Sequence, residues 1–185
     1  MEFFNHPNLV GKHSFLSPSK YHWINYDEEK LKNTYNNFLA VQRGTELHEF
    51  AAMCIRLGQK LPKSNKTINM YVNDAIGYRM KPEQPLYYSD NAFGTADSIS
   101  FIDNFLRIHD LKSGETPASV HQLEIYEALF CLEYHVNPKD IKAELRLYQS
   151  NEKLIFEPVA ADIAEIMEKI KGFDKIINKM KAEVE

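Results

Sequence analysis

The chain has 185 residues, of which 44% are hydrophobic and 26% are charged. These values are typical of a single soluble domain with a sizeable core, so we expect one domain over residues 1–185. No apolar run approaches the roughly 18 residues of a membrane span, and the amino terminus has no basic segment followed by an apolar one, so we expect neither a membrane protein nor a secretory signal. The formal net charge of −4 is unfavourable for a nucleic-acid binder.

The first part of the chain predicts helices. A short helix opens within residues 14–23, where Ser17 can act as the N-cap and Pro18 fits the first helical position. Residues 27–57 carry apolar side chains at three- and four-residue spacing, which predicts one long helix or two helices joined near Gly44. Glycine inside a helix costs about 1 kcal/mol relative to alanine, so we expect another group to approach the backbone there.

A basic segment follows this helix. Residues 56–81 contain six basic residues and one acidic residue, spread over a loop at 59–66 and a helix predicted at 67–79. Basic side chains gathered in one segment are the electrostatic footprint of phosphate binding, and a solvated face without a ligand is the alternative. We take four of these residues as candidate contacts to DNA: Lys60, Lys63, Lys66 and Arg79.

The centre of the chain predicts a β-hairpin. Residues 95–102 and 105–111 alternate polar and apolar side chains, as half-buried strands do. Both residues of Asp103-Asn104 tolerate positive φ, so a two-residue turn is expected. That register places Asp97 opposite Asp110, with Cβ atoms about 4.5–5.5 Å apart. Four apolar side chains are predicted on the face of the two aspartates: Ile99, Phe101, Leu106 and Ile108.

The two opposed aspartates favour a metal site. Like charges repel across a strand pair, and an apolar surrounding disfavours them further. A divalent cation removes both costs, and hard oxygen ligands suit Mg²⁺ or Mn²⁺. Alternation places Lys112 on the side of Asp110 and turns His109 to the opposite face, so we exclude this histidine. A lysine beside a metal can hold a water or a phosphate oxygen, which predicts metal-assisted phosphodiester hydrolysis.

The remaining segments complete the fold prediction. Residues 80–93 are expected to form a loop and an edge strand, and residues 118–135 a helix. Two strands are predicted at 141–149 and 153–159, followed by an amphipathic helix at 160–182. This order predicts an α/β fold with a small mixed β-sheet flanked by helices.

Four short motifs follow one another in the chain: GTELH at 44–48, GTAD at 94–97, DLKSG at 110–114 and Q-x-x-x-Y at 122–126. Placed on a helix, two strands and a helix, they resemble the RecB-like branch of the PD-(D/E)xK nuclease superfamily. Phage-type recombination exonucleases and CRISPR-associated exonucleases belong to this group. The resemblance implies a restriction-endonuclease-like catalytic core over about 86–185, preceded by a helical part over about 14–80.

The resemblance implies a role for each matching residue. Four groups would hold the metal: the side chains of His48, Asp97 and Asp110, and the backbone carbonyl of Leu111. Lys112 would be the catalytic lysine that positions or activates the attacking water. Gln122 and Tyr126 would orient the lysine and contact the DNA backbone. The implied reaction is Mg²⁺- or Mn²⁺-dependent hydrolysis of DNA that leaves 5′-phosphate ends.

The sequence departs from the family pattern in two places. The family often has an acidic residue four places after the histidine, where this chain has Ala52. Glu46 and Glu49 are the nearby acids, although neither has a helical spacing that suits this position, so one or two metals remain open. The clustered cysteines of the iron–sulphur members are absent, so we expect no iron–sulphur cluster. The two cysteines present, Cys54 and Cys131, are expected to be buried free thiols in a reducing cytoplasm.

The leading interpretation is a DNA exonuclease that acts on ends in replication, recombination or repair. We expect it in the cytoplasm of a prokaryotic or phage-infected host cell, with DNA and a recombination or replication protein as partners. A nicking endonuclease fits the same motifs. A non-catalytic DNA- or protein-binding module on a nuclease fold is the alternative from another class, and a purely structural hairpin is a third. The sequence leaves the oligomeric state open.

Overall fold

The fold is that of a computed structural model, which describes residues 7–9 and 12–183. The prediction of no secretory signal refers to residues 1–13, of which residues 1–6 and 10–11 lie outside the described part. The chain separates into two compact units, Met1–Arg43 and Gly44–Glu185. Within the described ranges, no helix combines the length and the apolar character that crossing a membrane requires.

The first unit holds two short 3-10 helices, η1 (Pro7–Leu9) and η2 (Pro18–Asn25), and the beginning of the long helix α1 (Glu28–Leu57). The predicted short helix begins at Pro18, but it is a 3-10 helix and Ser17 does not cap it. The Ser17 hydroxyl is instead hydrogen-bonded to the Ser19 hydroxyl at 2.9 Å. Side-chain capping is therefore not what starts this helix, and the fixed φ of its proline suits the first position.

Helix α1 is one continuous helix through Gly44, which decides between the two alternatives for residues 27–57. A Cβ atom at Gly44 would lie 2.9 Å from the Oγ of Ser113. The expectation that another group approaches this backbone is thus confirmed. The helix ends at Leu57, where Gly58 takes a φ of +65° and its N–H donates to the carbonyl of Ile55.

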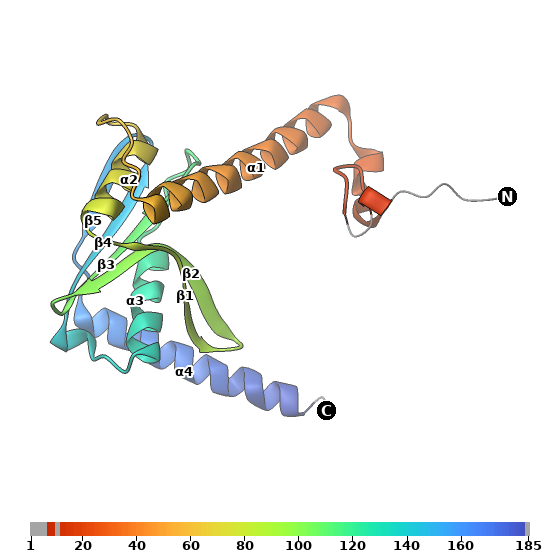
Figure 1. Cartoon of the computed structure of the whole chain (residues 1–185). Coiled ribbons are helices and arrows are strands. Elements are labelled where there is room, and N and C mark those ends of the chain that lie inside the picture. The colour runs from red at the N-terminus through yellow and green to blue at the C-terminus, as the bar shows by residue number, and fades with distance from the viewer. Residues whose placement is uncertain (1–6, 10–11, 184–185) are drawn as a thin grey trace. The chain divides into compact units, whose positions relative to one another are not determined.

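The second unit is built on a five-stranded sheet with the order β1-β2-β3-β4-β5 (Figure 1). Its strands are β1 (Lys81–Ser89), β2 (Ala92–Ile102), β3 (Phe105–Leu111), β4 (Lys142–Gln149) and β5 (Glu152–Phe156). All neighbours are antiparallel except β3 and β4, which are parallel. A parallel pair needs a crossover connection, and here that connection contains a helix. The two prolines of β1 lie on an edge strand, where proline is tolerated.

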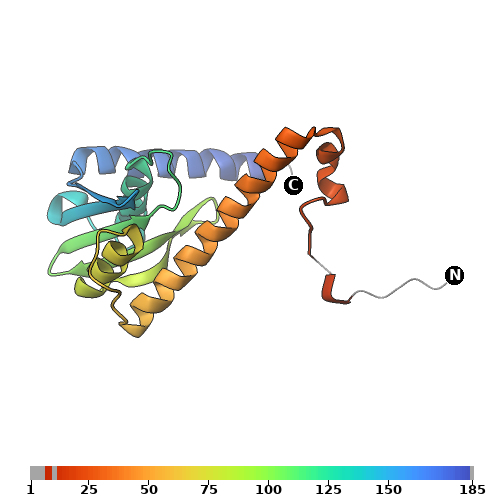
Figure 2. The ribbon, with the colours of Figure 1, turned by 90° about the horizontal axis from the view of Figure 1, so that it is seen from above.

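Helices cover both faces of this sheet (Figure 2). Helix α2 (Thr67–Gly77) packs on one face, over β3, β4 and β5. Helix α3 (His121–Glu133), which forms the crossover, packs on the other face, and α4 (Ala160–Ala182) packs against α3. A single 3-10 turn, η3 (Pro138–Asp140), precedes β4. The prediction of an α/β fold with a small mixed sheet between helices is confirmed.

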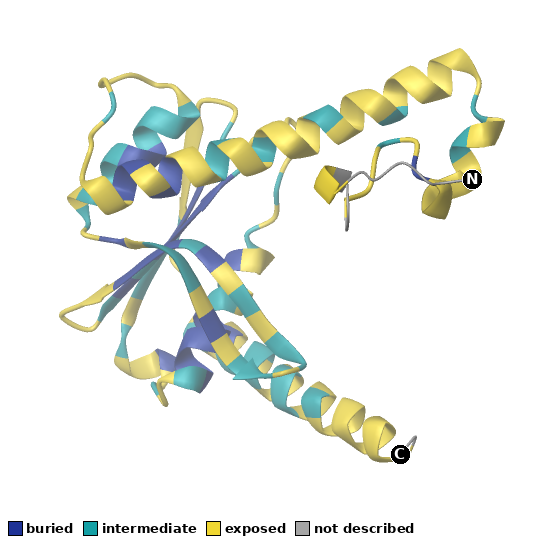
Figure 3. Ribbon diagram, turned by 45° about the vertical axis from the view of Figure 1, so that its right-hand side comes forward, coloured by how far each residue is buried: buried dark blue, intermediate teal, exposed yellow. Residues whose placement is uncertain are grey.

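Each face of the sheet has its own hydrophobic core, and Figure 3 shows the buried residues concentrated where helices meet strands. The core beneath α3 and α4 includes Ile99, Leu106 and Ile108 of the predicted face, whereas Phe101, the fourth member of that face, is 40% exposed. The core beneath α1 and α2 includes Leu111 and Tyr148. Both cysteines, Cys54 and Cys131, are free and buried, as predicted for their side chains.

The β2–β3 hairpin has the predicted register. Ile102 pairs with Phe105, and the antiparallel pairs continue as far as Ser98 with His109. The turn residues Asp103-Asn104 have φ values of +52° and +58°, the backbone that a two-residue turn of this kind needs.

Candidate functional site

Three carboxylates stand in one row across β1, β2 and β3. The β2–β3 register places Asp97 opposite Asp110, one pair beyond Ser98 and His109. The β1–β2 register places Glu83 opposite Asp97 on its other side. The pairs that flank this position are Pro82 with Ser98 and Gln84 with Ala96. Adjacent like charges on neighbouring strands destabilise a sheet, so this row calls for a compensating positive charge.

The strand β2 does not alternate regularly beside Asp97. Ala96 and Ile99 are both buried in the core beneath α3, although residues three apart on a regular strand point to opposite faces. The regular alternation predicted for residues 95–102 is therefore broken between them, an irregularity often found next to functional sites. At this break one Asp97 carboxylate oxygen lies 3.3 Å from Nδ1 of His48 on α1, and the other accepts a 2.8 Å hydrogen bond from the Leu111 N–H.

His48, Glu83 and Asp97 form a compact group of metal-ligand side chains. One ligand atom from each residue lies within 4.8 Å of the other two, and all three residues are half-buried. The hydrogen bond to Asp97 raises the pKa of His48, against the opposing effect of burial. Burial, followed by the charge of Asp97, raises the pKa of the Glu83 carboxyl. The group thus concentrates negative charge in a partly desolvated place.

Sequence reasoning missed Glu83. This residue lies in a segment predicted only as loop and edge strand, outside every motif. The turn at Asp90-Asn91 was not enough to find it, because a regular hairpin closed there sets Glu83 opposite Ser98. The register shift between Tyr87 and Ser89 is what places Glu83 opposite Asp97. The Glu83 φ of +50° is unusual for a residue other than glycine and is not readable from the sequence.

A chain of polar contacts runs from β3 to α3. The Lys112 Nζ lies 3.2 and 3.0 Å from the two carboxylate oxygens of Asp110 and donates a 2.7 Å hydrogen bond to Oε1 of Gln122. The amide of Gln122 in turn donates to the Tyr126 hydroxyl at 3.3 Å. The structure therefore brings together the four residues that the third and fourth motifs supply.

The carboxylate of Asp110 is deeply buried. The residue is 2% exposed, and its Oδ2 has the lysine ammonium nearby but no hydrogen bond. Burial, followed by the charge of Asp97, raises the pKa of Asp110, and Lys112 opposes that rise. A buried carboxylate oxygen without a hydrogen bond is uncommon and leaves a lone pair for a further ligand.

Two motif glycines set the distances between these elements. A Cβ atom at Gly94 would lie 3.0 Å from Cε1 of Tyr126, so this glycine lets α3 approach β2. Gly44 does the same for α1 and the loop at Ser113. Both approaches need the absence of a side chain rather than an unusual φ.

The four basic residues predicted as DNA contacts are not gathered at the carboxylates. Arg79 lines a cavity with Asp103-Asn104 at the turn end of the hairpin, about 17 Å along β3 from Asp110 at the strand rise per residue. Lys60 and Lys63 line another cavity that includes Asp74, and Lys66 immediately precedes α2. The charge run of the sequence is thus spread over separate places, and its role in DNA binding stays a prediction.

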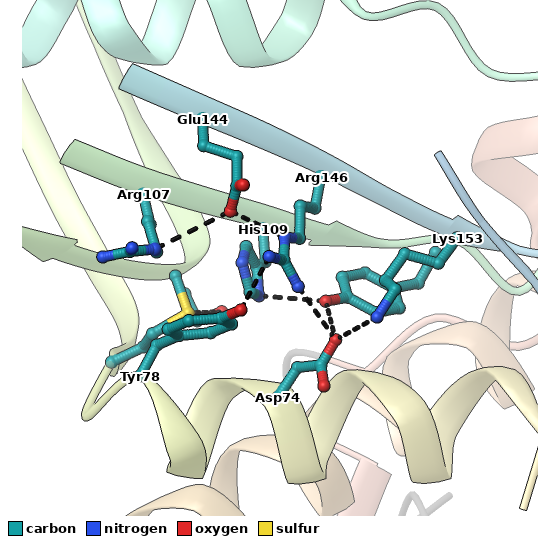
Figure 4. A network of polar contacts seen from close by, with 10 residues as sticks. Asp74, Tyr78, Arg107, His109, Glu144, Arg146 and Lys153 are labelled. Atoms are coloured by element: carbon teal, nitrogen blue, oxygen red, sulfur yellow. Dashed lines mark hydrogen bonds and ion pairs between the residues drawn. The ribbon is translucent and has the colours of Figure 1, made fainter. Parts of the chain in front are cut away.

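His109 lies on the opposite face of β3, as predicted, within a buried polar network (Figure 4). Burial and the charge of Arg146 lower the pKa of His109 to about 3, so the ring is neutral. Beside it, Asp74 of α2 accepts hydrogen bonds from Arg146, Tyr148 and Lys153 on the strands. This network joins α2 to β4 and β5, and the Tyr148 hydroxyl connects it to the ring of His109 on β3.

No family model, curated protein or solved structure matches this chain. The case for a function therefore rests on the residues of the site.

The residues present fit a divalent cation. Histidine nitrogen and carboxylate oxygens are donors that Mg²⁺ and Mn²⁺ accept. The row of Glu83, Asp97 and Asp110 has a surplus of negative charge, with Lys112 placed at one end of it. The free lone pair of the buried Asp110 Oδ2 is the further observation in favour of a cation.

Proposed function

We propose that this protein is a divalent-metal-dependent DNA nuclease of the RecB-like PD-(D/E)xK type, with a restriction-endonuclease-like core around its sheet. The observation that carries the proposal is the position of Lys112, whose ammonium contacts Asp110 and Gln122 next to a row of carboxylates. A lysine held there by two acceptors is placed to act on a phosphate or a water bound beside the acids.

The proposed roles follow the contacts. His48, Asp97 and Asp110, together with the Leu111 carbonyl, would hold Mg²⁺ or Mn²⁺. A cation bound there supplies a water of lowered pKa and polarises the scissile phosphate. The Leu111 N–H fixes the orientation of the Asp97 carboxylate through its 2.8 Å hydrogen bond.

Lys112 would donate a hydrogen bond to the attacking water or to the phosphate oxygen on which negative charge develops. Gln122 holds the ammonium in place, and Tyr126 supports the Gln122 amide. Attack in line with the leaving 3′-oxygen, which takes its proton from water, gives 5′-phosphate products.

The proposed substrate is DNA with an accessible end, and the proposed setting is replication, recombination or repair in the cytoplasm of a prokaryotic or phage-infected cell. A recombination or replication protein is the proposed partner. A nicking endonuclease uses the same residues. The non-catalytic binding module is the weaker candidate, because the full set of His48, Asp97, Asp110 and Lys112 is present, and a nuclease fold that only binds usually loses one of these residues.

The experiment compares end-labelled linear duplex with covalently closed circular DNA in the presence of Mn²⁺. Loss of linear DNA with 5′-phosphate products, while circles persist, supports the exonuclease. Nicking of the circular DNA would instead show that the protein is an endonuclease. If both DNA substrates remain intact, the non-catalytic binding module becomes the favoured interpretation, and the next step is a search for a bound protein partner.

A further inference from the structure

We propose that Glu83 is a ligand of the metal in this centre, so that the cation is held between α1 and the β1–β2 hairpin by His48, Glu83 and Asp97. The inference rests on the proposed metal dependence. It adds a ligand, and a strand that supplies it, outside the four motifs.

The first support is the spacing of the three donor atoms. One atom each from His48, Glu83 and Asp97 lies within 4.8 Å of the other two. Two ligands at about 2.1 Å from one Mg²⁺ are at most about 4.2 Å apart. Of three ligands only one pair can be trans, and cis ligands of an octahedral site are about 3.0 Å apart, close to the 3.3 Å between His48 Nδ1 and an Asp97 oxygen. The other donor pairs need to approach by at most about 2 Å to reach a coordinating arrangement.

The second support is the backbone of β1. Glu83 has a φ of +50°, while Pro82 and Gln84 on either side keep their pairing with β2. A residue other than glycine keeps such a conformation only where its surroundings impose it, and such residues cluster at functional sites. Within β1 the positive φ occurs at Glu83 alone, the residue opposite Asp97.

The third support is electrostatic. Glu83 is half-buried and stands opposite Asp97, so burial and a neighbouring like charge both disfavour its ionised carboxylate. His48 and Arg56 oppose this effect only in part. A cation shared with Asp97 would turn the repulsion between the two carboxylates into joint coordination.

Glu83 also fits better than the acids of α1. Position 52 of the helix, where an acid would follow His48 by one turn, is a buried alanine. Glu49 is exposed and lies near enough to influence the pKa of Glu83, but it is not part of the three-residue group. Glu83, which lies on β1, places its carboxylate beside His48 and Asp97.

The test is Mn²⁺ binding by the metal-free full-length chain, measured by calorimetry and by the EPR signal of free Mn²⁺. Glu83→Gln should weaken Mn²⁺ affinity at least about tenfold, since even indirect partners of a metal contribute that much. Glu49→Gln, the same change on a nearby acid, should leave the affinity within about twofold. Asp97→Asn is the reference for loss of the site.

A second variant guards against misfolding. Glu83→Gly suits the positive φ and removes the carboxylate, so it should fold and should lose the same Mn²⁺ affinity. The rise in melting temperature that Mn²⁺ gives the wild type should shrink in both Glu83 variants and persist in Glu49→Gln.

The outcomes separate this inference from the proposed function. If Asp97→Asn loses Mn²⁺ while Glu83→Gln and Glu83→Gly bind it like wild type, Glu83 is not a ligand and the metal-dependent nuclease stands. If Glu49→Gln loses Mn²⁺ affinity and the Glu83 variants do not, the carboxylate ligand is Glu49 of α1, and the inference is overturned. A wild type that binds no Mn²⁺ would overturn both.

Discussion

The ammonium of Lys112 joins the end of β3 to the start of α3, lying 3.0 Å from Oδ2 of Asp110 and 2.7 Å from Oε1 of Gln122. It provides the positive charge nearest to a carboxylate that is almost fully buried. A buried carboxylate needs such a partner to remain ionised. The lysine therefore has a structural role without metal and the proposed catalytic role with it, and the two can be measured separately.

Replacing this lysine should separate catalysis from metal binding. Lys112→Ala should abolish cleavage and retain Mn²⁺ binding, because the lysine is not a ligand. In EDTA the variant should lose about 1–3 kcal/mol of unfolding free energy, since Asp110 is left buried without its partner. Urea unfolding measures this loss, and Lys142→Ala at the exposed start of β4 is the matched control. An active Lys112→Ala protein would remove the role assigned to the lysine.

The close approach at Gly94 should be needed for activity. In Gly94→Ala the new methyl group would stand 3.0 Å from the Tyr126 ring. The ring must move, and Gln122 and Lys112 are linked to it by hydrogen bonds. We expect a loss of about 1–3 kcal/mol in stability and a larger loss in cleavage rate than in Mn²⁺ affinity. In the control Gly172→Ala of α4, the added Cβ has no atom within 4 Å, so neither the stability nor the cleavage rate should fall. Equal activity of Gly94→Ala and wild type would show that α3 tolerates displacement.

The contact of α1 with the loop after β3 can be tested by a double-mutant cycle. Gly44→Ala places a Cβ atom 2.9 Å from the Ser113 Oγ and should destabilise the protein. Ser113→Gly removes that oxygen, so the double variant should regain the loss and gain up to about 1 kcal/mol from alanine in a helix. Thermal unfolding of the four proteins gives the coupling energy. Additive effects would mean that these two residues do not meet.

Glu127 should contribute stability to the metal-free protein that falls as the pH rises from about 4.5 to about 7, whereas the buried neutral His109 contributes stability that rises over most of this range. Burial, followed by the charge of Glu124, raises the pKa of Glu127 to about 7, and its Oε2 has no hydrogen bond. In this window Glu127 binds a proton in the folded state that it has released in the unfolded state, so its contribution to the unfolding free energy decreases with pH. The decrease is at most about 3 kcal/mol at 1.36 kcal/mol for each unit.

Glu127→Gln should remove the Glu127 contribution, so the unfolding free energy of the variant should rise relative to that of the wild type as the pH increases, as urea unfolding in EDTA at several pH values would show. Glu165→Gln on the exposed face of α4 is the control and should keep the wild-type pH dependence. A difference between Glu127→Gln and the wild type that does not change with pH would show that Glu127 binds no proton in this range.

Local patterns in the sequence predicted the hairpin well. The two-residue turn at Asp103-Asn104, between two segments with strand-like patterns, defines the register that the structure shows, although the alternation within 95–102 is broken beside Asp97. The bounds of the last helix, 160–182, also agree, because its periodicity is uninterrupted. These features depend on neighbours in the sequence, which is why residue patterns capture them.

The rest depends on contacts between distant segments. Glu83 becomes part of the site through the β1–β2 pairing and a positive φ. The break in alternation beside Asp97 depends on how Ala96 and Ile99 pack beneath α3. The basic run 56–81 is separated in space because a loop, a helix and a strand divide it. The contact of Lys112 with Gln122 was expected only from the motifs of a resembling family, since no local pattern joins them.

The most direct test of the proposed nuclease is cleavage of labelled linear duplex by the wild type and by Asp110→Asn, each with Mg²⁺, with Mn²⁺ and with EDTA. Asp103→Asn makes the same change at the exposed hairpin turn, where asparagine tolerates the positive φ, and serves as the control. Removing the Asp110 charge relieves its repulsion with Asp97, so this variant should melt no lower than wild type in EDTA. We expect cleavage by the wild type and Asp103→Asn with either metal, and none with EDTA or with Asp110→Asn. Cleavage in EDTA, an active Asp110→Asn protein, or no cleavage by the wild type with any metal would contradict the proposal.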